Sequence, residues 1–221
     1  MKPGMRVWIL GLGLTAMVGC AQIVPALVLN YGPDLFATAI GDYGVRSEFR
    51  EATPLLEKKD WKGLLALTQV RLQRDSSRGE WWQLAGYAHM QLGEMAEARD
   101  CFARVTRLQP EEVNGWNFYA YSLKSLNDTR GALAAIKRAV EINPYSGTSY
   151  VILGELYRET GATQASLQAY QRAIEINNQD AFAWLGVGIL GKRNRDADLY
   201  EKARKALKQL SPELAAQLEK A

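Results

Sequence analysis

The chain has 221 residues, of which 48% are hydrophobic and 23% charged, a composition typical of folded rather than disordered proteins. Its 27 Lys and Arg exceed its 24 Asp and Glu by three, and this small excess argues against a nucleic-acid partner. One histidine and two cysteines exclude a disulfide framework and most metal sites.

Residues 1–30 are an apolar segment that predicts a transmembrane anchor. Lys2 and Arg6 precede a run from Val7 to Leu29 that is broken by Gln22, and these 23 residues match the roughly 20 that span a bilayer. No Lys or Arg occurs from Asn30 to Val45. We therefore expect a single-pass protein of a bacterial inner membrane, with a cytoplasmic N-terminus and the rest in the periplasm.

Two other interpretations of this segment stay open. A signal peptide is cleaved near Gly19 and Cys20 in the first. In the second, Cys20 is lipidated, because "MVGC" resembles the lipobox of lipoproteins at Gly19 and Cys20. It departs from that pattern at Met17 and in the apolar "IVPALVL" that follows. Both alternatives also place the remaining chain outside the cytoplasm.

Small residues recur within the apolar run. Gly11, Thr15 and Gly19 lie four residues apart and predict a smooth stripe along which another membrane helix packs. The frequent use of glycine in membrane helices explains the stripe equally well.

Residues 31–58 are expected to connect the anchor to a repeated region. "PDLFATAI" and "SEFREATPLLEKK" both predict helix, and Pro54 marks a helix start or a kink. The following "DWKGLLALTQVRLQRDSS" matches only the second half of the unit that is repeated further on.

A fixed repeat period then runs through the sequence. Equivalent positions hold Trp82, Trp116, Tyr150 and Trp184; Gly86, Ala120, Gly154 and Gly188; Ala98, Ala132 and Ser166; Phe102, Ile136 and Tyr170; and Pro110, Pro144 and Asn178. A period of this length, about 34 residues, is typical of stacked helix-turn-helix units in which small residues face large ones.

These units resemble the tetratricopeptide repeat (TPR) family over residues 79–178. The resemblance is carried by "WWQLAGYAHMQLGEMAEARDCFARVTRLQP", "WNFYAYSLKSLNDTRGALAAIKRAVEINP" and "YVILGELYRETGATQASLQAYQRAIEINN". Asn127 stands where the family often has Gly, and Asn178 where it has Pro. The resemblance implies an all-α solenoid over residues 59–212, with three clear repeats and degenerate flanking units.

The last unit fits the pattern less well. Three inserted residues would place Ala203 and Leu207 in the small and large positions of its second helix. Beyond it, Ser211, Pro212 and Glu213 have the cap, first-turn proline and first-turn acid of a helix start. Residues 213–221 are therefore expected to form a capping helix.

In the TPR family, the first helix of each unit lines a concave groove that binds peptides or partner helices. The resemblance implies that the groove positions here are Gln83, Tyr87 and Met90; Asn117, Phe118, Tyr121 and Lys124; and Val151, Glu155 and Arg158. Spacings of three and four place each group on one helix face. Tyr87 and Tyr121 are equivalent and are expected to form an aromatic ladder, although packing in the core is the alternative.

The ligand expected in this groove is an apolar or amphipathic segment. Members of the family that grip a C-terminal carboxylate use Lys and Asn at sites that hold Gln83, Tyr87 and Phe118 here. The carboxylate-binding mode is therefore not expected.

No motif for catalysis or for a cofactor is found. His89 and Cys101 are interpreted as packing residues, and CxxC, GxxxxGK[ST], GxSxG, HExxH and CxxCH are absent from the sequence. We expect no enzyme activity, no metal and no small-molecule substrate.

The sequence therefore predicts a membrane-anchored, periplasm-facing scaffold that assembles a multi-protein envelope complex through its groove. Two alternatives remain. One is a pilotin-like lipoprotein that assembles a pilus or secretion pore. The other is an accessory structural subunit of a larger membrane enzyme.

Overall fold

The computed structural model describes residues 49–221, which form helices joined by short turns, without a strand in that range. The helices are α3 (Thr53–Glu57), α4 (Trp61–Arg74), α5 (Gly79–Gln91), α6 (Met95–Leu108), α7 (Val113–Ser125), α8 (Thr129–Ile142), α9 (Gly147–Glu159), α10 (Thr163–Ile176), α11 (Ala181–Asn194), α12 (Ala197–Leu210) and α13 (Pro212–Lys220). The predicted anchor, its Gly11, Thr15 and Gly19 stripe and Cys20 lie outside the described residues. Within residues 49–221, no helix combines the length and the apolar character that crossing a membrane requires.

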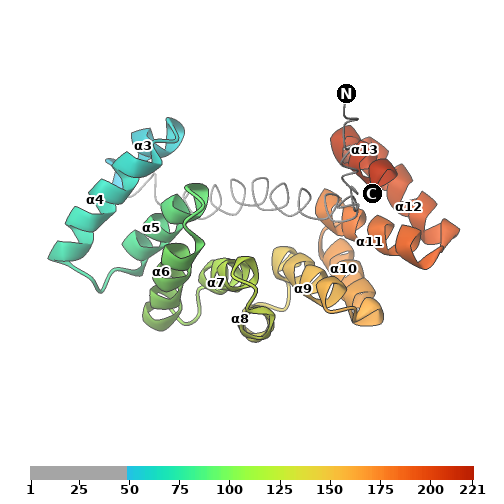
Figure 1. The fold of residues 1–221 in the computed structure, drawn as a ribbon, viewed down its shortest axis with the longest axis horizontal. Coiled ribbons are helices and arrows are strands. Elements are labelled where there is room, and N and C mark those ends of the chain that lie inside the picture. Colours follow the sequence, from blue (N-terminus) through green and yellow to red (C-terminus); the bar gives the residue numbers. More distant parts are fainter. Residues whose placement is uncertain (1–48) are drawn as a thin grey trace, which may run out of the picture.

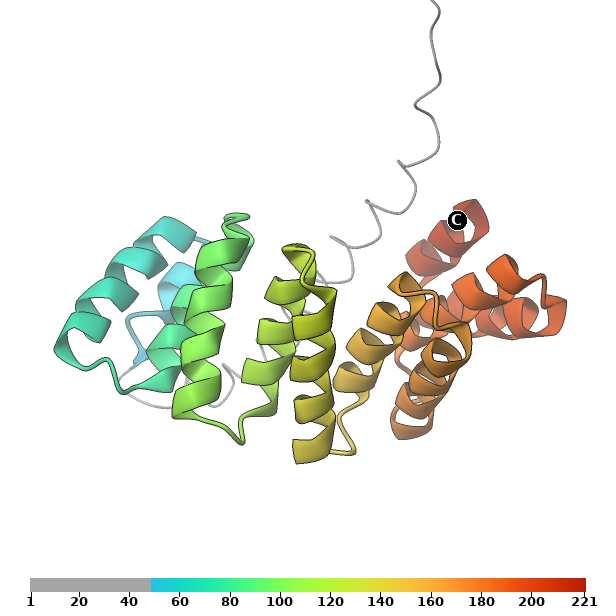
Figure 2. The same ribbon diagram turned by 60° about the horizontal axis from the view of Figure 1, so that its bottom comes forward.

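The repeat period of the sequence sets the helix boundaries. The first helices of successive units, α5, α7, α9 and α11, begin at Gly79, Val113, Gly147 and Ala181. The second helices, α6, α8, α10 and α12, begin at Met95, Thr129, Thr163 and Ala197, and α4 begins one period before α6. The predicted all-α solenoid is therefore confirmed. In Figure 1 the pairs follow one another along an arc, with α7 on its inner side and α8 on its outer side, and Figure 2 shows the pairs standing side by side.

A left-handed residue closes the turn between the two helices of each unit. The residues with positive φ are Lys59 (54°), Gly93 (80°), Asn127 (63°), Gly161 (76°) and Arg195 (60°), each one period after the one before. Glycine takes this conformation without steric cost, and asparagine tolerates it better than other residues. Asn127 therefore fills the family's glycine position without a change of turn.

Close approach of the paired helices depends on small residues. A Cβ atom on Gly86 would lie 2.9 Å from the Phe102 ring, and one on Gly154 would lie 2.8 Å from the Tyr170 ring. Phe102 is fully buried and Tyr170 is 2% exposed. The predicted pairing of small and large residues is thus observed in the packing of α5 on α6 and of α9 on α10.

Three of the four equivalent aromatic residues also tie successive units together. The indole Nε1 of Trp82, Trp116 and Trp184 donates to the backbone oxygen of Ser76, Pro110 and Asn178, at 2.9, 2.9 and 2.8 Å. In each case the acceptor lies six residues earlier, in the loop that precedes the helix. In these three units the tryptophan therefore ties the first helix to the loop that precedes it.

The predicted three-residue insertion in the last unit is wrong. Asp196 accepts a hydrogen bond from the backbone nitrogen of Leu199 at 3.0 Å, and this cap starts α12 in the unshifted register. Ala203 and Leu207 are nevertheless fully buried, as predicted. The unshifted register buries them too, because it makes them equivalent to two buried alanines of α10, Ala169 and Ala173.

The ends of the stack are closed by short helices. Ser211 caps α13, and Leu214 and Leu218 pack with Leu185 of α11 in one apolar cluster. At the other end, Phe49 is 1% exposed and packs on Trp81 with ring centroids 4.8 Å apart. The proposed domain limits at residues 30, 58 and 212 stay predictions.

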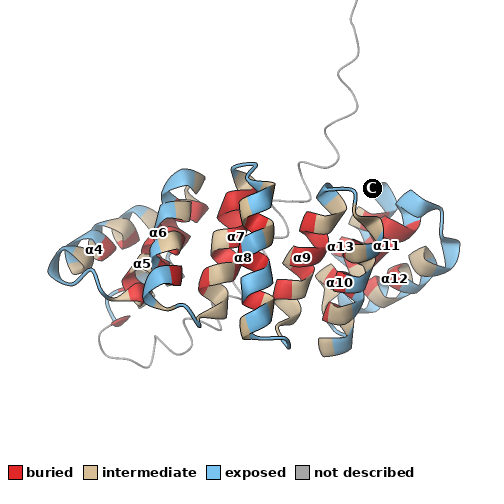
Figure 3. Ribbon diagram, turned by 90° about the horizontal axis from the view of Figure 1, so that it is seen from below, coloured by how far each residue is buried: buried red, intermediate tan, exposed pale blue. Residues whose placement is uncertain are grey.

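Exposed residues follow the outer helices. Figure 3, seen from below, shows exposed residues along α8 and α12 and buried ones along α7 and α9. The outer helix faces are therefore solvated, while the inner helices carry the residues that were expected to line the groove.

We expect Gly154→Val to lower the free energy of unfolding by about 1–3 kcal/mol, because overpacking forces a buried ring out of place. The ring is that of Tyr170. Urea unfolding followed by circular dichroism measures the change. Ala134→Val, at an exposed site of α8, is the matched control. Equal stability of the two variants would contradict the packing described here.

Candidate functional site

The residues predicted to line the groove all lie on the inner helices. Gln83, Tyr87 and Met90 belong to α5; Asn117, Phe118, Tyr121 and Lys124 to α7; and Val151, Glu155 and Arg158 to α9. All are buried except Arg158, which is half-buried. We call the surface formed by these ten residues the concave face.

Aromatic rings form a row at the α5 end of the concave face. The ring of Tyr87 contacts Trp61 at 5.6 Å and Phe118 at 6.4 Å, and Phe118 stacks on Phe102 at 5.1 Å. Within the described residues, the ring neighbours of Tyr87 are thus Trp61 and Phe118, and not the equivalent Tyr121. The expected ladder between the equivalent Tyr87 and Tyr121 is therefore not found among these residues. Tyr87 instead contacts one ring of α4 and one ring of α7.

Burial keeps the tyrosines of this face neutral. It raises the pKa of Tyr87 to about 12. It also raises the pKa of Tyr121, against the opposing effects of a hydrogen bond with Ser125 and of nearby Lys124. Both hydroxyls therefore keep their protons at neutral pH and can donate a hydrogen bond.

A buried ion-pair cluster lies between α7 and α9. Lys124 Nζ lies 2.8 Å from Glu155 Oε2 and 3.1 Å from Glu159 Oε1, and the side chains of Lys124 and Glu155 are both 5% exposed. Burial lowers the pKa of Lys124, but the two carboxylates outweigh burial and the net pKa is raised. Lys124 is therefore charged, and it links two successive units.

Arg158 brings a second positive charge next to the same carboxylates. Burial disfavours its charge, whereas its hydrogen bond with Tyr170 and the nearby Glu155 and Glu159 favour it, so that its pKa is raised. Burial raises the pKa of Tyr170, which keeps its proton. The positive charges of Lys124 and Arg158 equal the negative charges of two carboxylates. The concave face at α9 therefore has no net charge.

Asn117 and Glu155 each have one buried polar atom that lacks a hydrogen-bond partner among residues 49–221. Asn117 Oδ1 accepts a hydrogen bond from Ser149 Oγ at 2.8 Å, but the Asn117 Nδ2 is buried and unpaired there. Glu155 Oε1 is likewise buried and unpaired within that range, although Oε2 binds Lys124. A donor and an acceptor are therefore left over in an otherwise apolar and internally neutralised surface.

Three further residues contact this site although the sequence does not mark them, namely Ser149, Glu159 and Trp61. The Lys124–Glu155 pair joins residues 31 apart and the Asn117–Ser149 pair joins residues 32 apart. Neither separation equals the repeat period, so both contacts depend on how one unit is tilted relative to the next. The period alone carries no signal for them.

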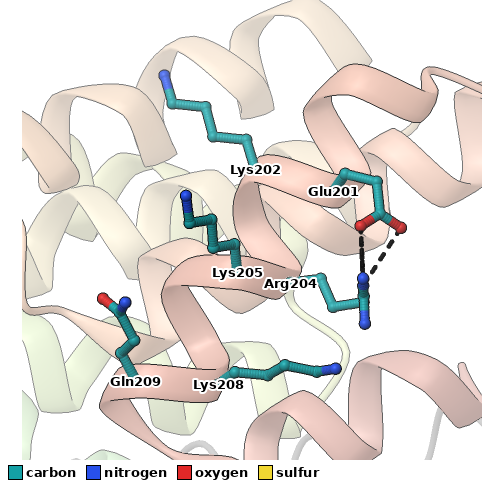
Figure 4. A pocket seen from close by; sticks show the side chains of 6 residues that line it. All are labelled: Glu201, Lys202, Arg204, Lys205, Lys208 and Gln209. Atoms are coloured by element: carbon teal, nitrogen blue, oxygen red, sulfur yellow. Dashed lines mark hydrogen bonds and ion pairs between the residues drawn. The ribbon is translucent and has the colours of Figure 1, made fainter.

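A shallow hollow of about 430 Å³ lies elsewhere, on α12. It is lined by Glu201, Lys202, Arg204, Lys205, Lys208 and Gln209. Figure 4 shows Lys202, Lys205 and Gln209 extending to one side of the helix and Arg204 and Lys208 to the other. Arg204 already pairs with Glu201 at 2.7 Å. These side chains are exposed, except for the half-buried Arg204, and the hollow is no part of the concave face.

Of the remaining reactive side chains, Cys101 is buried and His89 is half-buried and hydrogen-bonded. Burial, together with nearby Asp100 and Glu97, raises the pKa of the Cys101 thiol to about 12, so the thiol is protonated and unreactive. His89 Nδ1 lies 2.6 Å from Glu94 Oε2. Across the part of the chain that the structure describes, no three His, Cys, Asp or Glu residues are grouped to bind a metal.

One protein-family model matches the central helix pairs of this chain. The model of the tetratricopeptide repeat family matches residues 84–147 and 120–181. No curated protein matches the sequence.

Solved structures share the fold at low sequence identity. A protein of Thermus thermophilus, described as a thermophilic TPR protein, has a TM-score of 0.65 and 16% identity, covering 77% of this chain and 95% of its own. MamA from Desulfovibrio magneticus has a TM-score of 0.62 and 18% identity, covering 77% and 92%. YrrB, described as a TPR protein with an unusual peptide-binding site, has a TM-score of 0.61 and 20% identity, covering 84% and 98%.

We expect Lys124→Met to destabilise the protein by about 3 kcal/mol, because removing one partner of a buried ion pair leaves the other uncompensated. That other partner is Glu155, which is 4% exposed. The double variant Lys124→Met/Glu155→Gln should regain most of the loss, as measured by a double-mutant cycle in urea. Arg172→Met, which removes an exposed pair with Glu175, should leave the midpoint unchanged. Additive single effects would contradict a buried pair.

We also expect stability to fall between pH 8 and pH 9.5, by about 1 kcal/mol, because an unfolded thiol titrates near pH 8.5. In this range the folded state keeps the Cys101 proton that the unfolded state releases, so each rise in pH favours unfolding. Urea unfolding at both pH values measures the difference. Cys101→Ala should remove the slope, and a slope that persists in this variant would rule out the thiol as its source.

Proposed function

We propose that this chain, whose residues 84–181 match the model of the tetratricopeptide repeat family, is a protein–protein interaction scaffold that holds together a multi-protein complex of a bacterial envelope. The single observation that carries the proposal is the concave face. It gathers aromatic, amide and charged side chains from three successive inner helices. Aromatic and amide groups on one surface are the combination that protein interfaces favour.

The chemistry of this face supports an apolar or amphipathic protein segment as its ligand. Tyr87, Phe118 and Val151 are apolar members of this face, although each is buried, and the charges of Lys124 and Arg158 are balanced by nearby carboxylates. A free carboxylate terminus would find no uncompensated cation among the described residues of this face. The peptide-binding site named for YrrB, which shares this fold, is consistent with a peptide ligand.

The proposed scaffold is anchored in the inner membrane through residues 1–30 and exposes its repeats to the periplasm. The support is the apolar run Val7–Leu29 behind Lys2 and Arg6. We propose no catalytic role, since the described side chains with shifted pKa values serve packing and ion pairing. No nucleic acid or small-molecule substrate is part of the proposal.

Specific observations favour two other roles. The "MVGC" stretch ending at Cys20 favours a lipoprotein that assembles a pilus or secretion pore. The spacing of Gly11, Thr15 and Gly19 favours an accessory subunit that packs its membrane helix against a larger enzyme. Lipid attached to Cys20, or stable stoichiometric co-purification with a membrane enzyme, would identify these cases.

A photo-crosslinking residue at Tyr121 in living cells tests the proposed function. We expect it to capture a distinct protein, identified by mass spectrometry, because Tyr121 lies on the concave face. The same residue at Arg204, on the solvated surface of α12, is the control. If Arg204 captures the same protein, or Tyr121 captures none, the concave face is not the binding site.

A further inference from the structure

The excess positive charge of the chain is concentrated on its last outer helix, α12. The hollow on this helix is lined by four cations and one carboxylate, together with Gln209. These six residues carry a net charge of +3, which is also the formal net charge of the whole chain. All other charged residues of the sequence therefore balance one another, and the excess is left on this face of α12.

Three lysines of α12 occupy positions that are uncharged in the preceding outer helix, α10. One period earlier, Lys202, Lys205 and Lys208 are matched by Gln168, Gln171 and Ile174. The end unit of a solenoid needs a polar outer face, but amides or charges of either sign provide one. Solubility of the end of the array therefore does not account for three lysines.

Neighbouring carboxylates neutralise only part of this charge. Glu201 Oε2 lies 2.7 Å from Arg204 Nη2, so these two residues form a pair. Glu219 Oε1 of α13 lies 3.6 Å from Arg204 Nη1 and 4.0 Å from Lys208 Nζ, and its side chain is 49% exposed. With Glu219 counted beside the hollow residues, two positive charges remain uncompensated.

The other two lysines have no carboxylate partner within residues 49–221. Lys202 Nζ lies 6.0 Å from the centre of the Trp184 ring, and Lys205 forms no ion pair in that range. Like charges three or four residues apart on a helix repel each other, as Lys202 and Lys205 do here. A bound group of opposite charge would relieve this repulsion.

We propose that this face of α12 is a second docking surface, which binds an acidic segment of a partner protein. Charge complementarity identifies the occupant, because its carboxylates would pair with lysines that the chain itself leaves uncompensated. The concave face belongs to the inner helices, whereas α12 is an outer helix, so the two surfaces are separate. The chain would therefore hold two proteins at once, which goes beyond the function proposed for the concave face.

The geometry of the hollow favours a protein segment over a lipid surface. Lys202 and Lys205 extend to one side of α12 and Lys208 to the other, as Figure 4 shows. A flat bilayer would meet only one of these sides and would repel the exposed Glu201, whereas a segment lying in the hollow reaches both sides. From Lys202 to Gln209 the helix rises about 10 Å, which three or four extended residues match.

Fluorescence anisotropy with a labelled peptide of about eight glutamates tests the proposal, because this length exceeds that of the hollow. The full chain is kept in a neutral detergent. We expect the peptide to bind, and a glutamine peptide of the same length to give no signal. The triple variant Lys202→Gln/Lys205→Gln/Lys208→Gln should bind about tenfold more weakly, since exposed ion pairs are individually weak and act together. Absence of binding to the natural chain, or unchanged binding to the triple variant, overturns the proposal.

Matched variants separate this surface from the overall charge. Lys58→Gln/Lys62→Gln/Lys137→Gln removes three exposed lysines outside α12 and leaves the same net charge as the triple variant. It should bind the peptide within about twofold of the natural chain, because distant exposed charges are screened. Lys202→Arg/Lys205→Arg/Lys208→Arg keeps the charge and should preserve binding. An equal loss in both glutamine variants would show that affinity follows net charge alone, and the proposal would then fail.

Competition identifies the class of partner. Unlabelled glutamate peptide should displace the labelled peptide at a lower concentration of charge than mixed micelles with phosphatidylglycerol or a short oligonucleotide. Stronger displacement by the lipid or by the oligonucleotide would assign the face to a membrane or to nucleic acid and overturn the proposal. Self-association of the chain that disappears in the triple variant would show that a second copy supplies the carboxylates, which also overturns it.

Capture from Tyr121 in cells shows whether the two surfaces are separate. The triple variant should capture the same protein from Tyr121 with unchanged yield, because Tyr121 lies on the inner helix α7. Loss of that capture would mean that α12 and the concave face bind one partner together, and a second docking surface would be rejected.

Discussion

Close approach of the two helices within each unit is the constraint on which the other features depend. Gly86 and Gly154 leave room for the rings of Phe102 and Tyr170, so each pair can bury its apolar stripe with a partner only one turn away in sequence. In three of the four units, a tryptophan hydrogen bond also ties the first helix to the preceding loop. The inner helices then come to share one surface, and the concave face follows from this arrangement.

The contacts that define the site run between units. Lys124 and Glu155 join α7 to α9, as do Asn117 and Ser149. A buried ion pair adds little to stability compared with an apolar pair, but it is costly to break, so it favours one alignment of neighbouring units over others. The ion pair between α7 and α9 therefore both aligns the two units and neutralises charge within the concave face.

Much of the fold could be predicted from the sequence, because every unit places small and large residues at the same positions of its two helices. The tryptophan and glycine columns predict helix pairs, and the helix boundaries keep that register from α4 to α12. The last unit misled the prediction because Arg204 replaces the large apolar residue of its column, and Leu218 of α13 packs on Gly188 in its place. The inner-helix positions were predicted, but their partners Ser149 and Glu159 were not, since the tilt between units has no signature in single columns.

The turn residues show where the array is weakest. Gly93 and Gly161 adopt the left-handed conformation freely in the central units, whereas Lys59 and Arg195 must adopt it at the two ends. For lysine and arginine this conformation costs roughly 1–2 kcal/mol, whereas Asn127, in the middle of the array, tolerates it better. Since a solenoid is a chain of nearest-neighbour couplings, such strain at the termini favours fraying inward from both ends while the middle stays formed. The central units would thus act as the persistent platform, and the outer units as the part that gives way when a bulky partner enters.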